Sequence, residues 1–224
     1  GMDISDLEKT FVKSVVEAFE RYKLPIIRLD KANSREAICL VFEKVNVGGK
    51  KLDAFELVTA IYASDGFDLR EDWSGVSETV NSGRRARIIG ESGKRSVLAE
   101  IKSTDFLQAS AILHSRKNRL EREASGATGK DLPQVSCNRD ALLALPLSAY
   151  REFSDRLQQG FIDAGIFMNE LRIFGHDDIP YPPLVIAIAS VYGLLGRGEV
   201  TAAAKEKLAR WFWSVTLGEL YGSS

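Results

Sequence analysis

Twelve consecutive residues, Leu184 to Leu195, would place apolar side chains on nearly every face of a helix. A helix that is apolar all round must be surrounded by other parts of the protein. The run is also well short of the roughly 20 residues that a membrane-spanning helix needs. We therefore expect it to be the central, buried helix of a folded helical domain, and we expect no membrane partner.

Other segments have the apolar spacing of amphipathic helices. The clearest runs from Leu7 to Tyr22. Further helices are predicted over 54–64, around Trp73, and over 103–122, 138–145, 147–167 and 201–217. In the last of these, five residues are expected to face inward: Ala204, Leu208, Trp211, Phe212 and Val215. Gly, Ser and Pro residues predict loops at 82–96 and 124–135.

The segment from Leu24 to Leu57 packs several structural signals into a short length. A β-type run over 24–29 is followed by a predicted helix that begins at Asn33 or Ser34 and ends before Asn46, Gly48 and Gly49. Asp53 and Glu56 then have the spacing of a capping box. The predicted fold class is therefore mainly α: an irregular multi-helix bundle with one or two short β-strands near the N-terminus. Residues 1–224 form either a single helical domain or a fragment of a larger one.

This segment resembles the N-terminal domain family of GmrSD-type modification-dependent restriction systems. The matching residues are Leu24, Pro25, Ala37, Ile38, Phe42, Asn46, Gly48, Gly49, Leu52, Glu56 and Leu57. Ile179-Pro180-Tyr181-Pro182 resembles a second family motif before an apolar helix. The C-terminal Trp211-Phe212-Trp213 and Gly218-Glu219-Leu220-Tyr221 resemble its closing motif, with Leu220 where Arg is usual.

The resemblance implies a protein that senses or cleaves foreign or modified DNA. The family's chemistry belongs to a ParB-like front half with an Asp-Gly-Gln-Gln-Arg motif linked to nucleotide hydrolysis, and this string is absent here. We therefore predict the helical rear part of such a domain, with no catalytic residue of its own. The resemblance implies a nucleoside triphosphate and Mg²⁺ as cofactors of the full-length protein. It also implies that the full-length protein contains the front half and a C-terminal nuclease domain. Gly1-Met2 resembles a tag remnant or a start site, and we expect a longer natural chain.

Basic residues are concentrated between Gly83 and Arg122, although the formal net charge of the chain is −1. This stretch contains ten Lys or Arg and four Asp or Glu. Such a local excess is typical of a surface that contacts nucleic-acid phosphates. The alternative is a solvated loop followed by a charged helix end. The candidate DNA contacts are Arg84, Arg85, Arg87, Lys94, Arg95, Arg116, Lys117 and Arg119.

The turn formed by Asn46, Gly48, Gly49 and Lys50 is a second candidate site. Its backbone N–H groups and positive charge could meet a phosphate. The alternatives are a purely structural turn and a contact with the absent front half. Neither Gly93-Lys94 nor Gly129-Lys130 completes a phosphate-binding loop motif.

The remaining candidate residues are better explained by structure than by chemistry. Adjacent residues such as His176, Asp177 and Asp178 rarely point at one ion, so we predict no metal site. His114 could touch a phosphate, but a solvated surface histidine is the simpler interpretation. Trp211-Phe212-Trp213 is interpreted as core packing rather than as a base-stacking platform.

Two functions remain open at this point, with an independent enzyme as the least favoured third. The first is the helical scaffold part of a GmrSD-like DNA-defence protein, and the second is a helical protein–protein interaction module with no nucleic-acid role. Cys39 and Cys137 suggest free thiols in a reducing cytoplasm. Apolar edges left uncovered by truncation would permit a homodimer.

Overall fold

The computed structural model describes residues 4–23, 41, 53–76, 83–90 and 96–218. The chain divides into two compact units, residues 1–34 and residues 35–224, which are described separately. Throughout the described residues the regular structure is helical and contains no strand. The strand predicted over 24–29 and the helix predicted before Asn46 lie almost entirely outside the described residues.

The described part of the first unit, residues 4–23, forms one helical segment. It consists of α1 (Ile4–Phe11), a π-helical turn η1 (Val12–Val16) and α2 (Glu17–Arg21). The predicted amphipathic helix over 7–22 is confirmed. The large apolar side chains described from Phe11 onward are exposed, and Phe19 retains 82% of its accessible surface.

The second unit is a bundle built around a pair of closely packed helices. α9 (Leu147–Glu170) packs along α10 (Pro183–Leu195), and α7 (Ser103–Ala124) packs against both. The prediction that 184–195 is a central buried helix is confirmed, because Leu184, Ile188 and Ala189 are buried in the main core. No helix among the described residues has both the length and the apolar character that crossing a membrane requires.

Two glycines allow α9 and α10 to approach closely. A Cβ atom on Gly160 would lie 2.5 Å from the Ala189 carbonyl oxygen and 2.6 Å from the Gly193 nitrogen. Such distances are too short for any side chain, so the two helix backbones are in direct contact at this point. The crossing of α9 and α10 is therefore fixed by backbone shape as well as by apolar burial.

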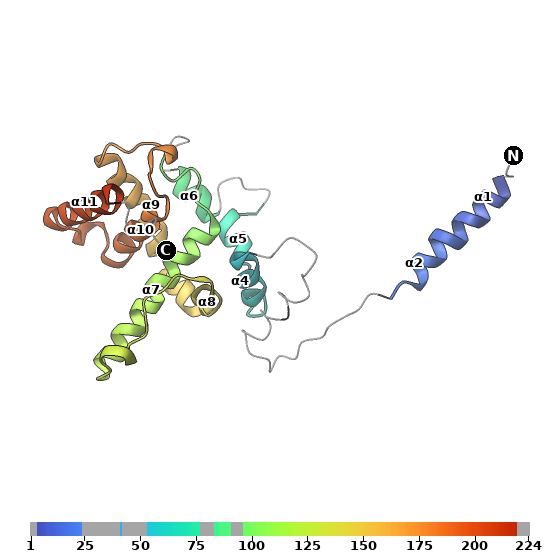
Figure 1. The fold of residues 1–224 in the computed structure, drawn as a ribbon, viewed down its shortest axis with the longest axis horizontal. Helices are drawn as coiled ribbons and strands as arrows, with labels where there is room; N and C mark the ends of the chain where they lie inside the picture. The colour runs from blue at the N-terminus through green and yellow to red at the C-terminus, as the bar shows by residue number, and fades with distance from the viewer. Residues whose placement is uncertain (1–3, 24–40, 42–52, 77–82, 91–95, 219–224) are drawn as a thin grey trace. The chain divides into compact units, whose positions relative to one another are not determined.

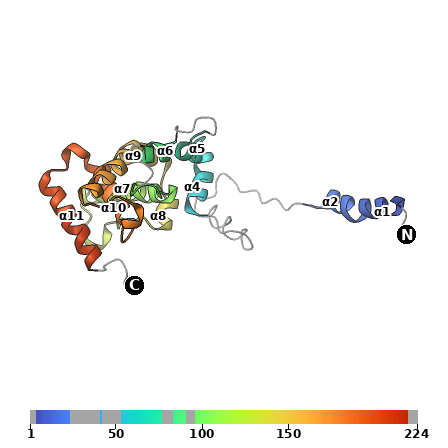
Figure 2. The same cartoon turned by 90° about the horizontal axis from the view of Figure 1, so that it is seen from above.

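Shorter helices surround this centre. α4 (Ala54–Ala63) packs against α5 (Leu69–Ser74), α7 and α8 (Arg139–Leu143), while α6 (Arg84–Gly90) packs against α5 and α9. Three short 3₁₀ turns connect the longer elements: η2 (Gly129–Asp131), η3 (His176–Asp178) and η4 (Arg197–Glu199). The last helix, α11 (Ala202–Leu217), lies along the outer edge of the bundle (Figure 1 and Figure 2).

Several helix starts follow from local hydrogen bonds that the sequence predicts. Asp53 and Glu56 form the expected reciprocal capping box at α4. The Asn138 side chain accepts from the Ala141 N–H at α8, and the Thr201 hydroxyl accepts from the Ala204 N–H at α11. These contacts involve residues three positions apart, so the local sequence is sufficient to specify them.

The predicted loop at 82–96 is wrong over residues 84–90, where the chain forms α6. Ile88 on this helix is fully buried, and Arg84 is buried with it. The apolar signal is weak in this stretch because a basic residue contributes one of the inward positions. The predicted loop at 124–135 is confirmed apart from Ala124, the last residue of α7, and the single turn η2.

Candidate functional site

Arg84, the first residue of α6, is held inside the bundle by two carboxylates. Its Nε donates to Asp72 Oδ2 at 2.7 Å, and its Nη1 donates to Asp155 Oδ1 at 2.7 Å. Only 8% of the residue is exposed. Burial opposes its charge, but the hydrogen bonds to Asp72 and Asp155 outweigh that effect and raise the pKa of Arg84. The guanidinium group therefore joins α5, α6 and α9.

Tyr150 on α9 completes this network. Its hydroxyl donates to the same Asp72 Oδ2 at 2.6 Å. Burial, followed by the negative charge of Asp72, raises the pKa of Tyr150 far above its usual range, so the phenol stays protonated as a donor. The Tyr150 ring packs against three other rings, those of Tyr62, Phe67 and Phe106. The network is thus continuous with the aromatic core.

Three more of the predicted DNA-contact residues are engaged within the bundle. Arg85 donates from Nε and Nη2 to the carbonyl oxygens of Ile101 and Ala99. Arg119 Nη1 donates to the Pro133 carbonyl oxygen at 3.0 Å. Lys117 Nζ lies 2.8 Å from both carboxylate oxygens of Glu152, and this hydrogen bond raises the pKa of Lys117. These cations hold loops and helices in place.

The structure does not gather the predicted basic residues on one face. The α6 residues lie at one end of the bundle, and the second half of α7, which carries Arg116, Lys117 and Arg119, extends away toward the opposite end (Figure 1). Arg116 is half-buried and Arg87 is exposed. Lys94 and Arg95 lie outside the described residues. Within the described part, the local excess of charge therefore does not become one continuous basic surface.

Arg87 lines an open recess beside α5. Asp68, Glu71 and Asp72 line the same recess, which has a volume of about 390 Å³. Asp68 already accepts from the Glu71 N–H as the α5 N-cap, and Asp72 is bound by Arg84 and Tyr150. Two of the three carboxylates thus have structural partners, and the recess presents mainly negative charge around one arginine.

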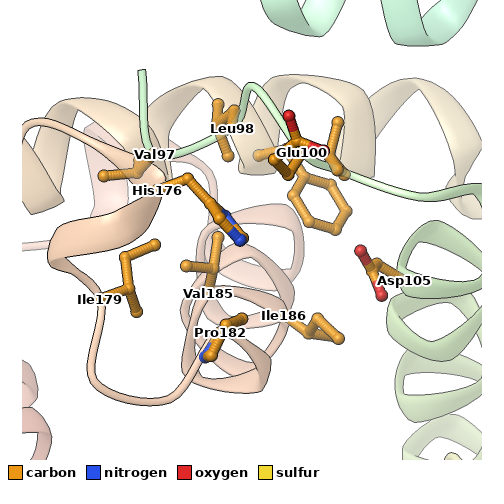
Figure 3. A pocket seen from close by; sticks show the side chains of 11 residues that line it. Val97, Leu98, Glu100, Asp105, His176, Ile179, Pro182, Val185 and Ile186 are labelled. Atoms are coloured by element: carbon orange, nitrogen blue, oxygen red, sulfur yellow. The ribbon is translucent and has the colours of Figure 1, made fainter. Parts of the chain in front are cut away.

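A second cavity lies between η3, α7 and α10 (Figure 3). His176 and Asp105 approach it from opposite sides, among apolar side chains that include Val185 and Ile186. Its volume of about 30 Å³ is enough for a water molecule and too small for a substrate. Burial raises the pKa of Asp105, against the opposing effects of the Lys102 N–H and the nearby charges of Lys102 and His176.

The histidine candidates have structural roles. His176 belongs to the 3₁₀ turn η3, where Asp178 accepts from the Gly175 N–H at 2.9 Å. His114 is half-buried rather than solvated, and its Nε2 lies 3.1 Å from Asn118 Nδ2. Burial and the charge of Lys117 lower the pKa of His114, which disfavours the cationic form that would bind a phosphate. No cluster of three or more potential metal ligands occurs in the described part of the chain.

The aromatic residues of α11 differ from the prediction. Phe212 is fully buried, but Trp211 and Trp213 are 39% and 38% exposed. The expected inward orientation of Trp211 is therefore wrong. Adjacent helical residues point about 100° apart, and α11 packs through a narrow face that includes Phe212 and leaves the rings on either side of it partly exposed. Leu217, one turn after Trp213, is also exposed.

The turn of Asn46, Gly48, Gly49 and Lys50 lies outside the described residues, as does most of the motif that carries the GmrSD resemblance. Comparison of the chain with protein-family models, curated proteins and solved structures gives no match. The resemblance therefore rests on the motif residues alone.

The partners of the buried Arg84 could not be predicted from the sequence. Asp72 and Asp155 are 12 and 71 positions from Arg84, and Tyr150 is 78 positions from Asp72. A charged residue inside a basic stretch is ordinarily interpreted as solvated. Large apolar residues were the usable signal: Trp73 and Ile88 indicate that α5 and α6 each have a buried face.

Proposed function

We propose that this chain is the helical scaffold part of a GmrSD-like DNA-defence protein, and that it binds other parts of that protein rather than DNA. The observation that carries the proposal is that Arg84, Arg85, Lys117 and Arg119 already bind carboxylate or carbonyl oxygens of the bundle, Arg84 as a buried residue and the other three at its surface. A cation already bound to carboxylates or carbonyls must break those contacts before it can neutralise a phosphate.

The contact surface we assign to this scaffold is the outer side of α11. Trp211 and Trp213 flank the one buried ring and are about 40% exposed. Large, partly exposed aromatic residues are enriched in protein–protein interfaces because they bury much apolar area with little loss of conformational freedom. Under the resemblance, the partner is the ParB-like half, which would also hold the nucleotide triphosphate and Mg²⁺.

The alternative function is a helical interaction module outside any DNA-defence system. The same exposed aromatic residues favour it, and the choice between the two depends on the partner. We assign both to a reducing cytoplasm, where the free thiol of Cys137 would persist.

The first experiment measures binding of the chain to an unmodified DNA duplex by fluorescence anisotropy at about 50 and about 200 mM salt, because binding through many phosphates weakens steeply over this range. We expect no binding at either concentration. Salt-sensitive binding that is lost in a variant combining Arg87→Ala and Arg116→Ala would overturn the scaffold assignment. These two residues are chosen because Arg84→Ala would disturb the bundle itself.

The second experiment supplies a ParB-like half from a GmrSD-type protein as a separate polypeptide. Binding should shift the tryptophan emission to shorter wavelength as Trp211 and Trp213 lose water. The variant combining Trp211→Ala and Trp213→Ala should abolish the binding itself, which is measured by sedimentation velocity because this variant lacks both reporting rings. The substitution Phe174→Ala, at another exposed aromatic residue, is the matched control. Absence of binding, with a folded bundle, would favour the alternative interaction module.

A further inference from the structure

Asp163 on α9 is a buried carboxylate outside the network of Arg84. Only 2% of the residue is exposed. Its Oδ1 accepts from Gln159 Nε2 at 3.1 Å, one helical turn earlier, whereas its buried Oδ2 has no hydrogen-bond partner among the described residues. Buried carboxylates are ordinarily hydrogen-bonded or paired with a cation, because an unpaired charge in the interior is costly. The free oxygen therefore marks a position where a donor is required.

The cation beside this carboxylate is Arg197, which belongs to the turn η4 between α10 and α11. Its Nε lies 3.9 Å from Asp163 Oδ1, within ion-pair range but too far for a hydrogen bond. The Arg197 side chain is 59% exposed, so much of it is still in water. The pair is thus brought together by the fold without being fully formed.

Other charged groups lie at the same corner of the bundle. Burial and the negative charges of Glu170 and Asp163 raise the pKa of Tyr192 to about 12. The positive charge of Arg197 opposes this effect, so all four groups are close enough to influence one another. Lys205 of α11 is already bound to Glu170 at 2.7 Å. This leaves Arg197 as the described cation that is placed to bind Asp163.

The chemistry of a guanidinium group suits both oxygens of the carboxylate. Its parallel N–H donors match a carboxylate in a bidentate pair, which is among the strongest of charge-assisted hydrogen bonds. The long Arg197 side chain can move through solvent without disturbing the packing of a helix. Such a movement would supply a donor to Asp163 Oδ2 and replace the loose contact at Oδ1 with a hydrogen bond.

We propose that η4 is a strap that closes onto α9, with the Arg197 guanidinium group bound to both carboxylate oxygens of Asp163. η4 leads into α11, which begins at Ala202, so the closed strap fixes where that helix starts. The strap uses neither Trp211 nor Trp213. It can therefore fail while the α11 contact surface stands, and the reverse also holds.

The test is a double-mutant cycle on the full chain, read as the equilibrium constant of unfolding from urea titration. Arg197→Gln should raise this constant by about tenfold or more, because a buried carboxylate loses its cation. In the Asp163→Asn background the same substitution should raise it by less than about twofold, since no charge remains to be paired. Equal effects in the two backgrounds would mean that Asp163 does not depend on Arg197, and would overturn the proposal.

The matched control is the exposed ion pair of Arg210 with Glu206 on α11, whose atoms lie 2.9 Å apart. Arg210→Gln should raise the unfolding constant by less than about twofold, as is usual for solvent-exposed pairs. An effect of Arg197→Gln no larger than this would show that Arg197 is an ordinary surface residue, and the strap would be ruled out.

Two further measurements separate a hydrogen-bonded strap from a loose ion pair. Arg197→Lys keeps the charge but not the bidentate geometry, so it should still raise the unfolding constant by about threefold or more. The Arg197 Nε–H group should exchange with solvent at least about tenfold more slowly than that of Arg210, because hydrogen bonding protects it. Full stability in Arg197→Lys, or equal exchange rates for the two arginines, would each overturn the bidentate closure.

Discussion

Helix α10, which is apolar nearly all round, and the amphipathic segment 4–21 differ in whether their apolar side chains are buried. Leu184, Ile188 and Ala189 of α10 are buried between α9 and α7, whereas Phe11 and Phe19 of the N-terminal segment are exposed. In both cases the apolar pattern predicts that the apolar face of the helix is buried. The pattern does not predict which surface buries that face, whether it belongs to the same unit or to another molecule.

Helix α11 falls between these two extremes. Phe212 is fully buried, and the neighbouring Trp211 and Trp213 retain more than a third of their exposure. Lys205 adds an ion pair to Glu170 of α9 at 2.7 Å. One fully buried ring, one exposed ion pair and a row of partly buried apolar residues (Ala204, Leu208, Ala209 and Val215) attach the inner side of this helix, so its outer side is available for a second contact.

The largest effect should come from the single buried ring of α11. We expect Phe212→Ala to lower the free energy of unfolding by about 4 kcal/mol, because the substitution removes a fully buried aromatic side chain and leaves a cavity. Urea denaturation followed by circular dichroism measures this change. Trp211→Ala, on the exposed side, should cost less than about 1 kcal/mol. Equal losses from the two substitutions would mean that α11 is attached by both rings.

The close crossing of α9 and α10 should give the next largest effect. Gly160→Ala should lower the free energy of unfolding by about 2 kcal/mol, since the added methyl group would meet backbone atoms that cannot move aside. Gly198→Ala is the matched control, because a Cβ atom there would meet nothing within 4 Å. Thermal unfolding of both variants measures the difference. If Gly160→Ala instead stabilised the protein, α9 and α10 would be able to move apart easily. The contrast between this buried crossing and the exposed N-terminal segment would then weaken.

The smallest effect should come from the N-terminal segment. At concentrations low enough to keep the chain monomeric, Phe19→Ser should change the free energy of unfolding of the bundle by less than about 0.5 kcal/mol, as expected for an exposed position. Urea titration at about 1 µM protein measures it. A loss of several kcal/mol in the monomer would show that this ring is part of the folded core, and would remove the contrast with α10.

Local signals explain which parts of the fold were predictable. The capping residues Asp53, Asn138 and Thr201 each bind an N–H group three positions away, so a short sequence window contains both partners. The buried position of α10 follows from composition alone. These predictions required no knowledge of how distant segments meet.

Distant partners explain the errors. Residues 84–90 were predicted to be loop because Arg84 has no apolar character, and the carboxylate that holds it from α9 is 71 positions away. The candidate DNA contacts were grouped by sequence proximity, whereas the bundle separates α6 from the second half of α7 (Figure 1). A count of charges cannot distinguish a cation in water from one that joins two helices.

Apolar spacing and hydrogen bonds between near neighbours are enough to predict that this protein is mainly helical, where most of the described helices begin, and which helix is central. The other features depend on contacts between distant segments: Arg84 and Lys117 form ion pairs, Phe212 rather than Trp211 enters the core, and two glycines bring α9 and α10 into contact. Each of these depends on which segments meet in space, and the free energy of those contacts is shared between residues that are far apart in the chain.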